Sequence, residues 1–358
     1  MSARETYPGC VQGRKRESGR VAQHPSAWHD RLMRMVAARR YGGPDVLRLE
    51  DAPTPVAGEG QVLVRVRASS VNPVDWHELR GTPYLVRIGR GLSRPTTPAM
   101  GTDVAGVVEA VGPGVTRWSV GDEVFGMGAG AWAERMVVRE DGIARRPDSV
   151  SAADAGAVAV AGLTALQGLR TVGGLRPGQR VLVNGASGGV GHLAVQIAKL
   201  LGGKVTAVAS TPNLGLVTRL GADDVVDYTV DDFAQQIPRY DLVFDLVGNR
   251  PLGELRRVLT PEGTIVLCGA PRGQWIGPLV PVIRGAIVTR VSRHTVRSFL
   301  AHRVEADLQQ LGEWLGTTAL RVVLESSAPL ERIAEAVARS ETGRVRGKVG
   351  VDVDVAAE

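Results

Sequence analysis

Three glycines, Gly185, Gly188 and Gly191, recur at every third position between an apolar run at 181–183 and a helical pattern at 190–201. With a second apolar run at 205–209, residues 181–210 are predicted to form a strand, glycine turn, helix and strand, the first βαβ unit of a doubly wound sheet. Glycine permits positive φ angles and close approach of a backbone to an anion. The free amides at a helix N-terminus favour phosphate. This spacing therefore suits the binding of a dinucleotide pyrophosphate.

A tight turn without a ligand is the alternative, but it leaves the repeated absence of side chains unexplained. We expect the whole turn to line a cofactor: Gly185, Ala186, Ser187, Gly188, Gly189, Val190 and Gly191. His192 follows in the first helical turn, where we expect it to face solvent.

The end of the second strand carries hydroxyl and amide side chains, Ser210, Thr211 and Asn213. NAD sites place an Asp or Glu roughly 20 residues after the glycine turn, where it accepts a hydrogen bond from the ribose 2′-hydroxyl. This stretch has no carboxylate that would repel a 2′-phosphate, and its hydroxyls can donate to one. We therefore predict NADPH as the cofactor.

The elements that must position these residues fall into two groups. Short apolar runs at 62–66, 104–111, 123–125 and 133–138 predict an antiparallel, barrel-like region, and small-residue helical spacing at 151–169 leads into the glycine turn. After residue 210 we predict helices at 214–220, 231–236 and 252–259, strands at 225–226, 241–246 and 264–268, and a further, last strand at 286–291. Helices at 304–315 and 330–338 and a strand at 348–353 follow. The predicted fold class is α/β: a Rossmann-type doubly wound parallel sheet and a β-barrel domain.

Composition is that of an ordinary globular protein, with 358 residues, 44% apolar and 22% charged. No apolar run approaches the roughly 20 residues needed to cross a bilayer, and the N-terminus has no apolar signal core, so we expect a cytoplasmic protein. Two cysteines, Cys10 and Cys268, are too few for a disulfide framework or a four-thiolate zinc site.

The net charge of +6 is concentrated near the N-terminus. Residues 1–34 contain seven Lys or Arg and three Asp or Glu, a net +4, without periodicity. We interpret this segment as a disordered extension. It could bind nucleic acid, but aromatic residues other than Tyr7 and Trp28 are absent from it, and we predict no nucleic-acid partner.

From residue 35 onward the chain resembles the medium-chain dehydrogenases/reductases, specifically their zinc-free quinone oxidoreductase and enone reductase branch. The resemblance rests on YGGPDVLRLED at 41–51, SSVNPVDWHELRG at 69–81, GTDVAGVVEAVGPGV at 101–115, GDEVFG at 121–126, AGLTALQGL at 161–169, NGASGGVGHLAVQIAK at 184–199, LGADDVVDY at 220–228, DLVFDLVG at 241–248 and RGKVGV at 346–351. It implies a GroES-like catalytic domain at 35–158 and 298–358 and a Rossmann NADP(H)-binding domain at 159–297.

The resemblance also bears on the site. Zinc-dependent relatives place a cysteine in the stretch where this chain has Asn72, and a His-Glu pair where it has Thr102 and Asp103, so we expect no metal. Near the cofactor the resemblance implies Asn72, Thr164, Tyr228, Val247, Gly269, Ala270 and Lys348. Thr164 could equally bond its own helix backbone, and Tyr228 could equally belong to the core.

Candidates for the catalytic cleft lie in or after the NPVD stretch at 72–75. Tyr84 or His77 could protonate the enolate left by hydride addition, and water could do so equally well. Asp75 could be polar cleft machinery or could hold its loop together.

The resemblance and the absent metal ligands predict hydride transfer from NADPH to a quinone or to the C=C bond of an α,β-unsaturated carbonyl. The alternatives are a zinc-independent alcohol dehydrogenase, a biosynthetic tailoring reductase, or an NADPH-binding sensor without turnover. A small-molecule substrate is expected, with no membrane partner, and a homodimer formed through edge strands near 286–291.

Overall fold

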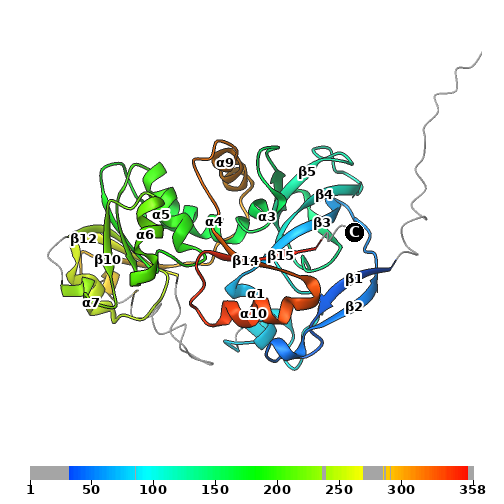
Figure 1. Cartoon of the computed structure of the whole chain (residues 1–358), viewed down its shortest axis with the longest axis horizontal. Coiled ribbons are helices and arrows are strands. Elements are labelled where there is room, and N and C mark those ends of the chain that lie inside the picture. Colours follow the sequence, from blue (N-terminus) through cyan, green and yellow to red (C-terminus); the bar gives the residue numbers. More distant parts are fainter. Residues whose placement is uncertain are drawn as a thin grey trace, which may run out of the picture.

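The computed structural model describes residues 32–84, 86–235, 239–268, 285, 288–290 and 292–353. Two lobes lie side by side (Figure 1). One lobe holds six described strands, all parallel, in the order β10-β9-β8-β11-β12-β13. Their bounds are β8 Arg180–Asn184, β9 Lys204–Ala209, β10 Asp224–Asp227, β11 Tyr240–Asp245, β12 Leu259–Leu267 and β13 Thr295–Ser298. This sheet confirms the predicted Rossmann-type fold.

Helices cover this sheet, and its central strands β8, β9 and β11 are buried on both faces. The helices are α4 Ala159–Leu166, α5 Gly191–Leu200, α6 Leu214–Arg219 and α7 Leu252–Arg257, and a π-helical turn at Gln167–Val172 continues α4. Apolar residues of β8, α4 and α5, such as Val183, Leu166 and Ile197, belong to one hydrophobic core. Burial of these faces is the main force holding the helices to the sheet.

The second lobe is the predicted barrel-like domain. Its strands run in the order β14-β15-β3-β4-β5-β7, with β6 paired to β3. Their bounds are β3 Gln61–Val71, β4 Asp103–Val111, β5 Glu123–Met127, β6 Arg135–Arg139, β7 Ile143–Arg145, β14 Leu324–Pro329 and β15 Lys348–Asp352. β1 Leu32–Ala37 and β2 Arg48–Pro53 form a separate antiparallel pair.

Both ends of the described chain meet in this lobe. β15 pairs antiparallel with β3, Val349 opposite Val71, and the two lie together in Figure 1. The helices around them are α1 Pro73–Arg80, α2 Val86–Arg90, α3 Ala152–Ala155, α9 Glu305–Gly316 and α10 Ile333–Glu341. The C-terminal segment therefore returns beside the strand that leads into the NPVD stretch, although the exact domain boundaries stay predictions.

Two sequence-based expectations need correction. The predicted strand at 286–291 is wrong, because Val288, Thr289 and Arg290 are helical and the sixth strand of the sheet is β13. The predicted helix at 231–236 is only a 3-10 turn, Phe233–Gln235, in its described part. β14 had no prediction.

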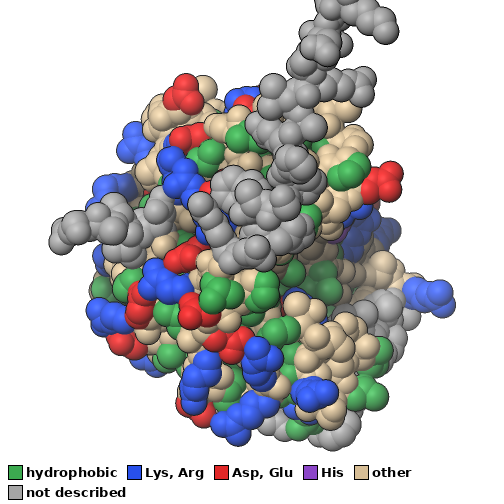
Figure 2. Space-filling model, turned by 90° about the vertical axis from the view of Figure 1, so that its right-hand side faces the viewer, with side chains coloured by type: hydrophobic (Ala, Val, Ile, Leu, Met, Phe, Trp, Pro, Cys, Tyr) green, Lys and Arg blue, Asp and Glu red, His purple; other side chains and the backbone are tan. Residues whose placement is uncertain are grey.

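Charges on the described surface are mixed. On the face of the barrel lobe in Figure 2, Lys and Arg side chains are interspersed with Asp and Glu side chains. Many are paired, as Arg34 is with Glu134 and Arg117 with Glu305. None of the helices in the described part of the chain has both the length and the apolar character that a bilayer crossing requires.

Candidate cofactor and active site

The glycine turn joins β8 to α5, and its glycines have separate roles. Gly185 has φ +85°, a conformation that side chains rarely adopt. At Gly191 a Cβ would lie 2.1 Å from the carbonyl oxygen of Gly185, so this glycine allows the helix to pack on the end of the strand. At Gly188 and Gly189 a Cβ would meet nothing nearer than 3.4 Å. A Cβ at either position would make ordinary van der Waals contacts, so the packing of the protein does not require the last two glycines.

The turn lies at the point where the strand order reverses. β8, the first strand in sequence, is flanked by β9 and β11. At the carboxyl ends of β8 and β11, Asn184 donates to Asp245 at 2.8 Å. Asp245 also accepts from the backbone amides of Val247 and Gly248 at 3.1 Å each. Parallel sheets bind nucleotides in the crevice at such a switch point.

The polar residues after β9 form one cluster with the glycine turn. Asn213 donates to the hydroxyls of Ser187 and Ser210, each at 3.2 Å. Its Oδ1 accepts from Nε of Arg346 at 3.0 Å, and Arg346 also donates to the carbonyl of Pro212. Sequence reasoning missed Arg346, which lies 133 residues from Asn213 along the chain. A guanidinium thus lies beside the hydroxyl and amide groups that follow β9.

A carboxylate that sequence reasoning also missed lies beside Thr211. Oγ1 of Thr211 donates to Asp227 at 2.5 Å, and Thr229 donates to the same carboxylate. These hydrogen bonds hold the pKa of Asp227 below its ordinary value. Tyr228 follows directly and is 56% exposed, so the core position considered for it is wrong.

The segment 346–348 links the cofactor turn to the interior of the barrel lobe. The backbone amide of Gly347 donates to the carbonyl of Ser187 at 2.8 Å. Nζ of Lys348 donates to Oδ1 of Asn72, and it lies 3.3 Å from Oδ2 of Asp103. Lys348 therefore reaches Asn72 and Asp103 within a buried network.

Asp103 is the centre of that network. Its Oδ2 accepts from Ser70 at 2.7 Å and from Nδ2 of Asn72 at 2.9 Å, and its Oδ1 accepts from the backbone amide of Val160 at 2.8 Å. Burial of a charge is costly unless it is paired and hydrogen-bonded, and here both conditions are met. The carboxylate thereby ties the start of β4 to the end of β3 and the start of α4.

Asp75 lies in the first turn of α1 and is buried. Its Oδ2 accepts from the backbone amide of Asn72 at 2.7 Å, at the N-terminus of the helix, and its Oδ1 accepts from Thr102 at 2.6 Å. Burial raises the pKa of Asp75 to about 7, against the opposing effect of the hydrogen bonds from Thr102 and Asn72. These contacts match the loop-holding role considered for this residue.

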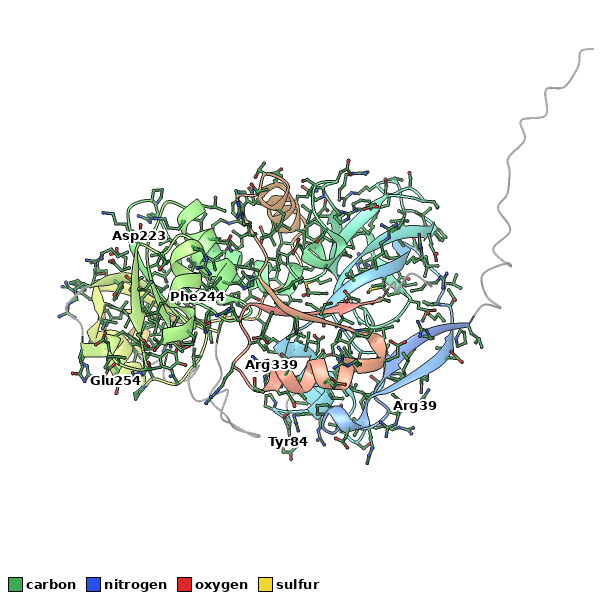
Figure 3. The ribbon with its side chains drawn as sticks, in the orientation of Figure 1. Arg39, Tyr84, Asp223, Phe244, Glu254 and Arg339 are labelled. Atoms are coloured by element: carbon green, nitrogen blue, oxygen red, sulfur yellow. The ribbon has the colours of Figure 1, made fainter. Side chains whose placement is uncertain are left out.

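His77 lies in α1 and is bonded to the loop that follows this helix, and Tyr84 lies in that loop. Nδ1 of His77 lies 2.8 Å from the carbonyl of Thr82, so this nitrogen carries the proton. Burial lowers the pKa of His77, which leaves a neutral ring at pH 7. Tyr84 lies at the outer edge of the barrel lobe (Figure 3), with the guanidinium of Arg87 4.7 Å from its ring centre.

Thr164 and His192 are both bonded to backbone carbonyls of nearby residues. Thr164 bonds the carbonyl of Val160 in its own helix at 2.7 Å, the role considered as its alternative. His192 is fully buried, so its expected solvent-facing position is wrong. Its Nδ1 bonds the carbonyl of Gly188 at 3.0 Å, and burial lowers the pKa of His192 to about 4. Gly269 and Ala270 lie outside the described residues.

Among the described residues, no group of three or more His, Cys, Asp or Glu side chains could hold a metal ion. Asn72 and Asp103, at the positions where zinc-dependent relatives place ligands, are instead hydrogen-bonded to Lys348.

Comparisons with known proteins agree with this geometry. Residues 58–148 match the family described as alcohol dehydrogenase GroES-like domain, and residues 220–351 match the family described as zinc-binding dehydrogenase. The chain is 34% identical over 339 residues to the chloroplast envelope quinone oxidoreductase homolog of Arabidopsis thaliana, covering 90% of this chain and 99% of the relative. It is 33% identical to the 2-methylene-furan-3-one reductase of Solanum lycopersicum, with 86% and 76% covered.

Solved structures show the same architecture. The quinone oxidoreductase from Coxiella burnetii superposes with a TM-score of 0.80 at 28% identity, covering 90% of this chain and all of that one. A mycobacterial protein complexed with NADPH superposes with a TM-score of 0.77 at 29% identity, with 89% and 99% covered.

Proposed function

The chain belongs to the quinone oxidoreductase branch of the medium-chain dehydrogenase/reductase superfamily, and we propose that it transfers hydride from NADPH to a quinone or to the C=C bond of an α,β-unsaturated carbonyl, without zinc. The observation that carries the proposal is the glycine turn between β8 and α5, which lies at the N-terminus of α5 and at the switch point of the sheet. A pyrophosphate fits there because a helix N-terminus attracts an anion and the turn carries no side chain at Gly188 or Gly189.

The residues of this chain have distinct roles in binding. The glycine turn would hold the pyrophosphate, and the cluster of Ser210, Asn213 and Arg346 would hold the adenosine ribose and its 2′-phosphate. Asn72, joined to the turn through Lys348 and Gly347, would stand at the nicotinamide end. When bound, the nicotinamide supplies the hydride.

The preference for NADPH rests on Arg346. Its planar guanidinium can donate two N–H groups to a phosphate. A hydrogen bond from the guanidinium to a neutral ribose hydroxyl is weaker, because the hydroxyl carries no negative charge. Asp227 also lies beside Thr211, but its carboxylate is already bonded to Thr211 and Thr229. The mycobacterial relative that was solved with NADPH supports the same choice.

The donor set at Asn72 and Asp103 supports the zinc independence that we propose. Catalytic zinc takes three protein ligands and keeps one open position. Here the Asp103 carboxylate accepts hydrogen bonds from Ser70, Asn72 and the amide of Val160 and pairs with Lys348, so a dication would have to displace a buried ammonium. Reduction at carbon does not require a metal to lower the pKa of a bound hydroxyl.

The proton that completes the reduction comes from solvent in this proposal. His77 is neutral at pH 7 and its Nδ1 proton already faces Thr82, while Asp75, in the first turn of α1, is buried. Replacement Tyr84→Phe is therefore expected to leave the reduction rate within about threefold. A much larger loss would assign the proton to the Tyr84 hydroxyl instead.

The proposal is tested by deuteride transfer from stereospecifically labelled NADPH to quinones, alkenals and cyclic enones. We expect deuterium at the carbon β to the carbonyl of the enones, or reduced quinone, and slower reaction with labelled NADH. Protein that binds NADPH yet reduces no acceptor would indicate a sensor, and reaction only with saturated ketones would indicate an alcohol dehydrogenase. A homodimer and a cytoplasmic location remain part of the proposal, and sedimentation of the purified chain tests the first.

A further inference from the structure

Lys348 carries a buried positive charge whose hydrogen bonds are directed at one amide and one carboxylate. Its side chain is 2% exposed and that of Asp103 is fully buried, with Nζ 3.3 Å from Oδ2 of Asp103. Nζ also donates to Oδ1 of Asn72. Desolvation of an ammonium is compensated here by one opposite charge and one carbonyl dipole.

This arrangement allows the Asn72 amide one orientation. Its oxygen faces the ammonium of Lys348, and its NH2 group lies 2.9 Å from the carboxylate of Asp103. Rotation of the amide by half a turn would place NH2 against the ammonium and the oxygen against the carboxylate. Both contacts would then be repulsive in a buried environment, where charges are poorly screened.

In this orientation the Asn72 side chain keeps one N–H group that is only weakly hydrogen-bonded. The second contact of Nδ2, to the Ser70 hydroxyl, is 3.5 Å long, at the outer limit for a hydrogen bond. One N–H of Asn72 is therefore weakly engaged, and its direction is set by the other bonds of the amide.

Lys348 is also fixed relative to the glycine turn. The preceding residue, Gly347, donates its backbone amide to Ser187 at 2.8 Å, and Arg346 bonds Asn213. Three consecutive residues therefore connect the adenosine end of the cleft, the glycine turn and Asn72.

We propose that Lys348 is a positioning residue for hydride transfer, which acts by holding the Asn72 amide in one orientation relative to the glycine turn. This inference rests on the proposed function. It separates Lys348 from the direct cofactor ligands, because its ammonium is already bonded to Asn72 and Asp103 inside the protein.

The test removes both charges together. Lys348→Met alone leaves Asp103 buried without its cation and risks unfolding, whereas Lys348→Met/Asp103→Asn is neutral and similar in shape. Three quantities are measured: the Tm of the protein without cofactor, the Kd of NADPH from quenching of tryptophan fluorescence, and the single-turnover rate of NADPH oxidation by a quinone. The wild type is measured first, and NADPH binding without turnover there would contradict the proposed function itself.

For the paired variant we expect a Tm within a few degrees of the wild type and a Kd within about threefold, but a hydride-transfer rate lower by about 10- to 100-fold. Asn72→Ala should lower the rate by a similar factor. Combining Asn72→Ala with the paired variant should lower it no further, because Lys348 acts through Asn72.

Three results would overturn the inference. A paired variant with full rate would make the ion pair merely structural. A rise in Kd as large as the expected fall in rate would make Lys348 a cofactor ligand. Additive losses in the combined variant would show that Lys348 acts independently of Asn72.

Discussion

Three buried ionisable residues shape the electrostatic environment of this site. Asp75, Asp103 and Lys348 are all buried, and each is bonded to a residue of the NPVD stretch or lies in it. Fixed charges in a dry interior act more strongly than the same charges in water. The candidate site therefore rests on a framework of buried polar residues that substrate and cofactor need not contact directly.

The carboxyl of Asp75 makes the stability of the protein depend on pH. Its pKa is raised to about 7 by burial, and it faces Asp103 and Lys348. Because the folded pKa lies above the unfolded value, the folded state binds the proton more tightly, so this group costs stability as pH rises from about 4 to about 7. Asp75→Asn keeps an acceptor for the Asn72 amide and removes the charge. In urea unfolding, the free energy of unfolding of the variant relative to that of the wild type should rise by roughly 2–3 kcal/mol between pH 5 and pH 8. An equal difference between the two proteins at both pH values would contradict this.

Arg346 should decide between the two nicotinamide cofactors. Arg346→Gln removes the cation beside Asn213, and hydrogen bonds to charged groups contribute about 1.5–3 kcal/mol. We expect the Kd of NADPH to rise about 10- to 100-fold while that of NADH changes little, as measured by titration calorimetry. Arg344→Gln, two residues away on the exposed surface, is the matched control and should change neither. Equal weakening for both cofactors would remove Arg346 from the phosphate site.

Among the structural elements, the glycine turn contains two kinds of glycine: those that the fold requires and those that we expect only cofactor binding to require. Gly185 and Gly191 serve the protein, through a positive φ and a close backbone contact. At Gly188 and Gly189 an added Cβ would make only ordinary van der Waals contacts, so packing does not require glycine there.

Two alanine substitutions in this turn should therefore behave in opposite ways. Gly189→Ala should leave Tm within about 2 °C, because its Cβ would make only ordinary van der Waals contacts. It should raise the Kd of NADPH about tenfold or more, because glycine lets the backbone of such a turn approach the pyrophosphate closely. Gly191→Ala places a Cβ 2.1 Å from a backbone oxygen and should lower Tm markedly. Thermal unfolding and fluorescence titration of both proteins give the comparison. Loss of Tm in Gly189→Ala with unchanged affinity would argue against a pyrophosphate there.

Local sequence patterns predicted the elements well but not the contacts between distant ones. The βαβ unit at 181–210 follows from its apolar runs and glycines. The strand predicted at 286–291 failed because a short apolar run such as AIV fits a buried helix equally well. The pairs Arg346–Asn213 and Lys348–Asn72 span 133 and 276 residues. Only the return of β15 to β3 creates them, and no local pattern encodes that return.

For the whole molecule, this return makes the segment 344–348 a connection between the lobes. It lies between α10 and β15, next to Arg339 at the junction in Figure 3. Arg339 bonds Glu325 and the carbonyl of Arg344, and Glu325 in turn accepts from the amide of Arg346. These contacts hold the segment in the shape that presents Arg346 and Gly347 to the cofactor lobe.

Gly347→Ala should weaken this connection and cofactor binding together. Gly347 has φ +70°, and a Cβ there would lie 2.1 Å from the carbonyl oxygen of Val323. Gly343→Ala is the matched control, since Gly343 has φ +66° and open space around its Cβ position. Backbone strain alone costs about 1 kcal/mol, or roughly 2–4 °C in Tm, so the control should show that loss and keep its affinity for NADPH. For Gly347→Ala we expect at least twice that fall in Tm and about a tenfold rise in the Kd of NADPH, by calorimetry. Equal effects of the two substitutions would mean that the segment binds the cofactor lobe too loosely to couple the two halves.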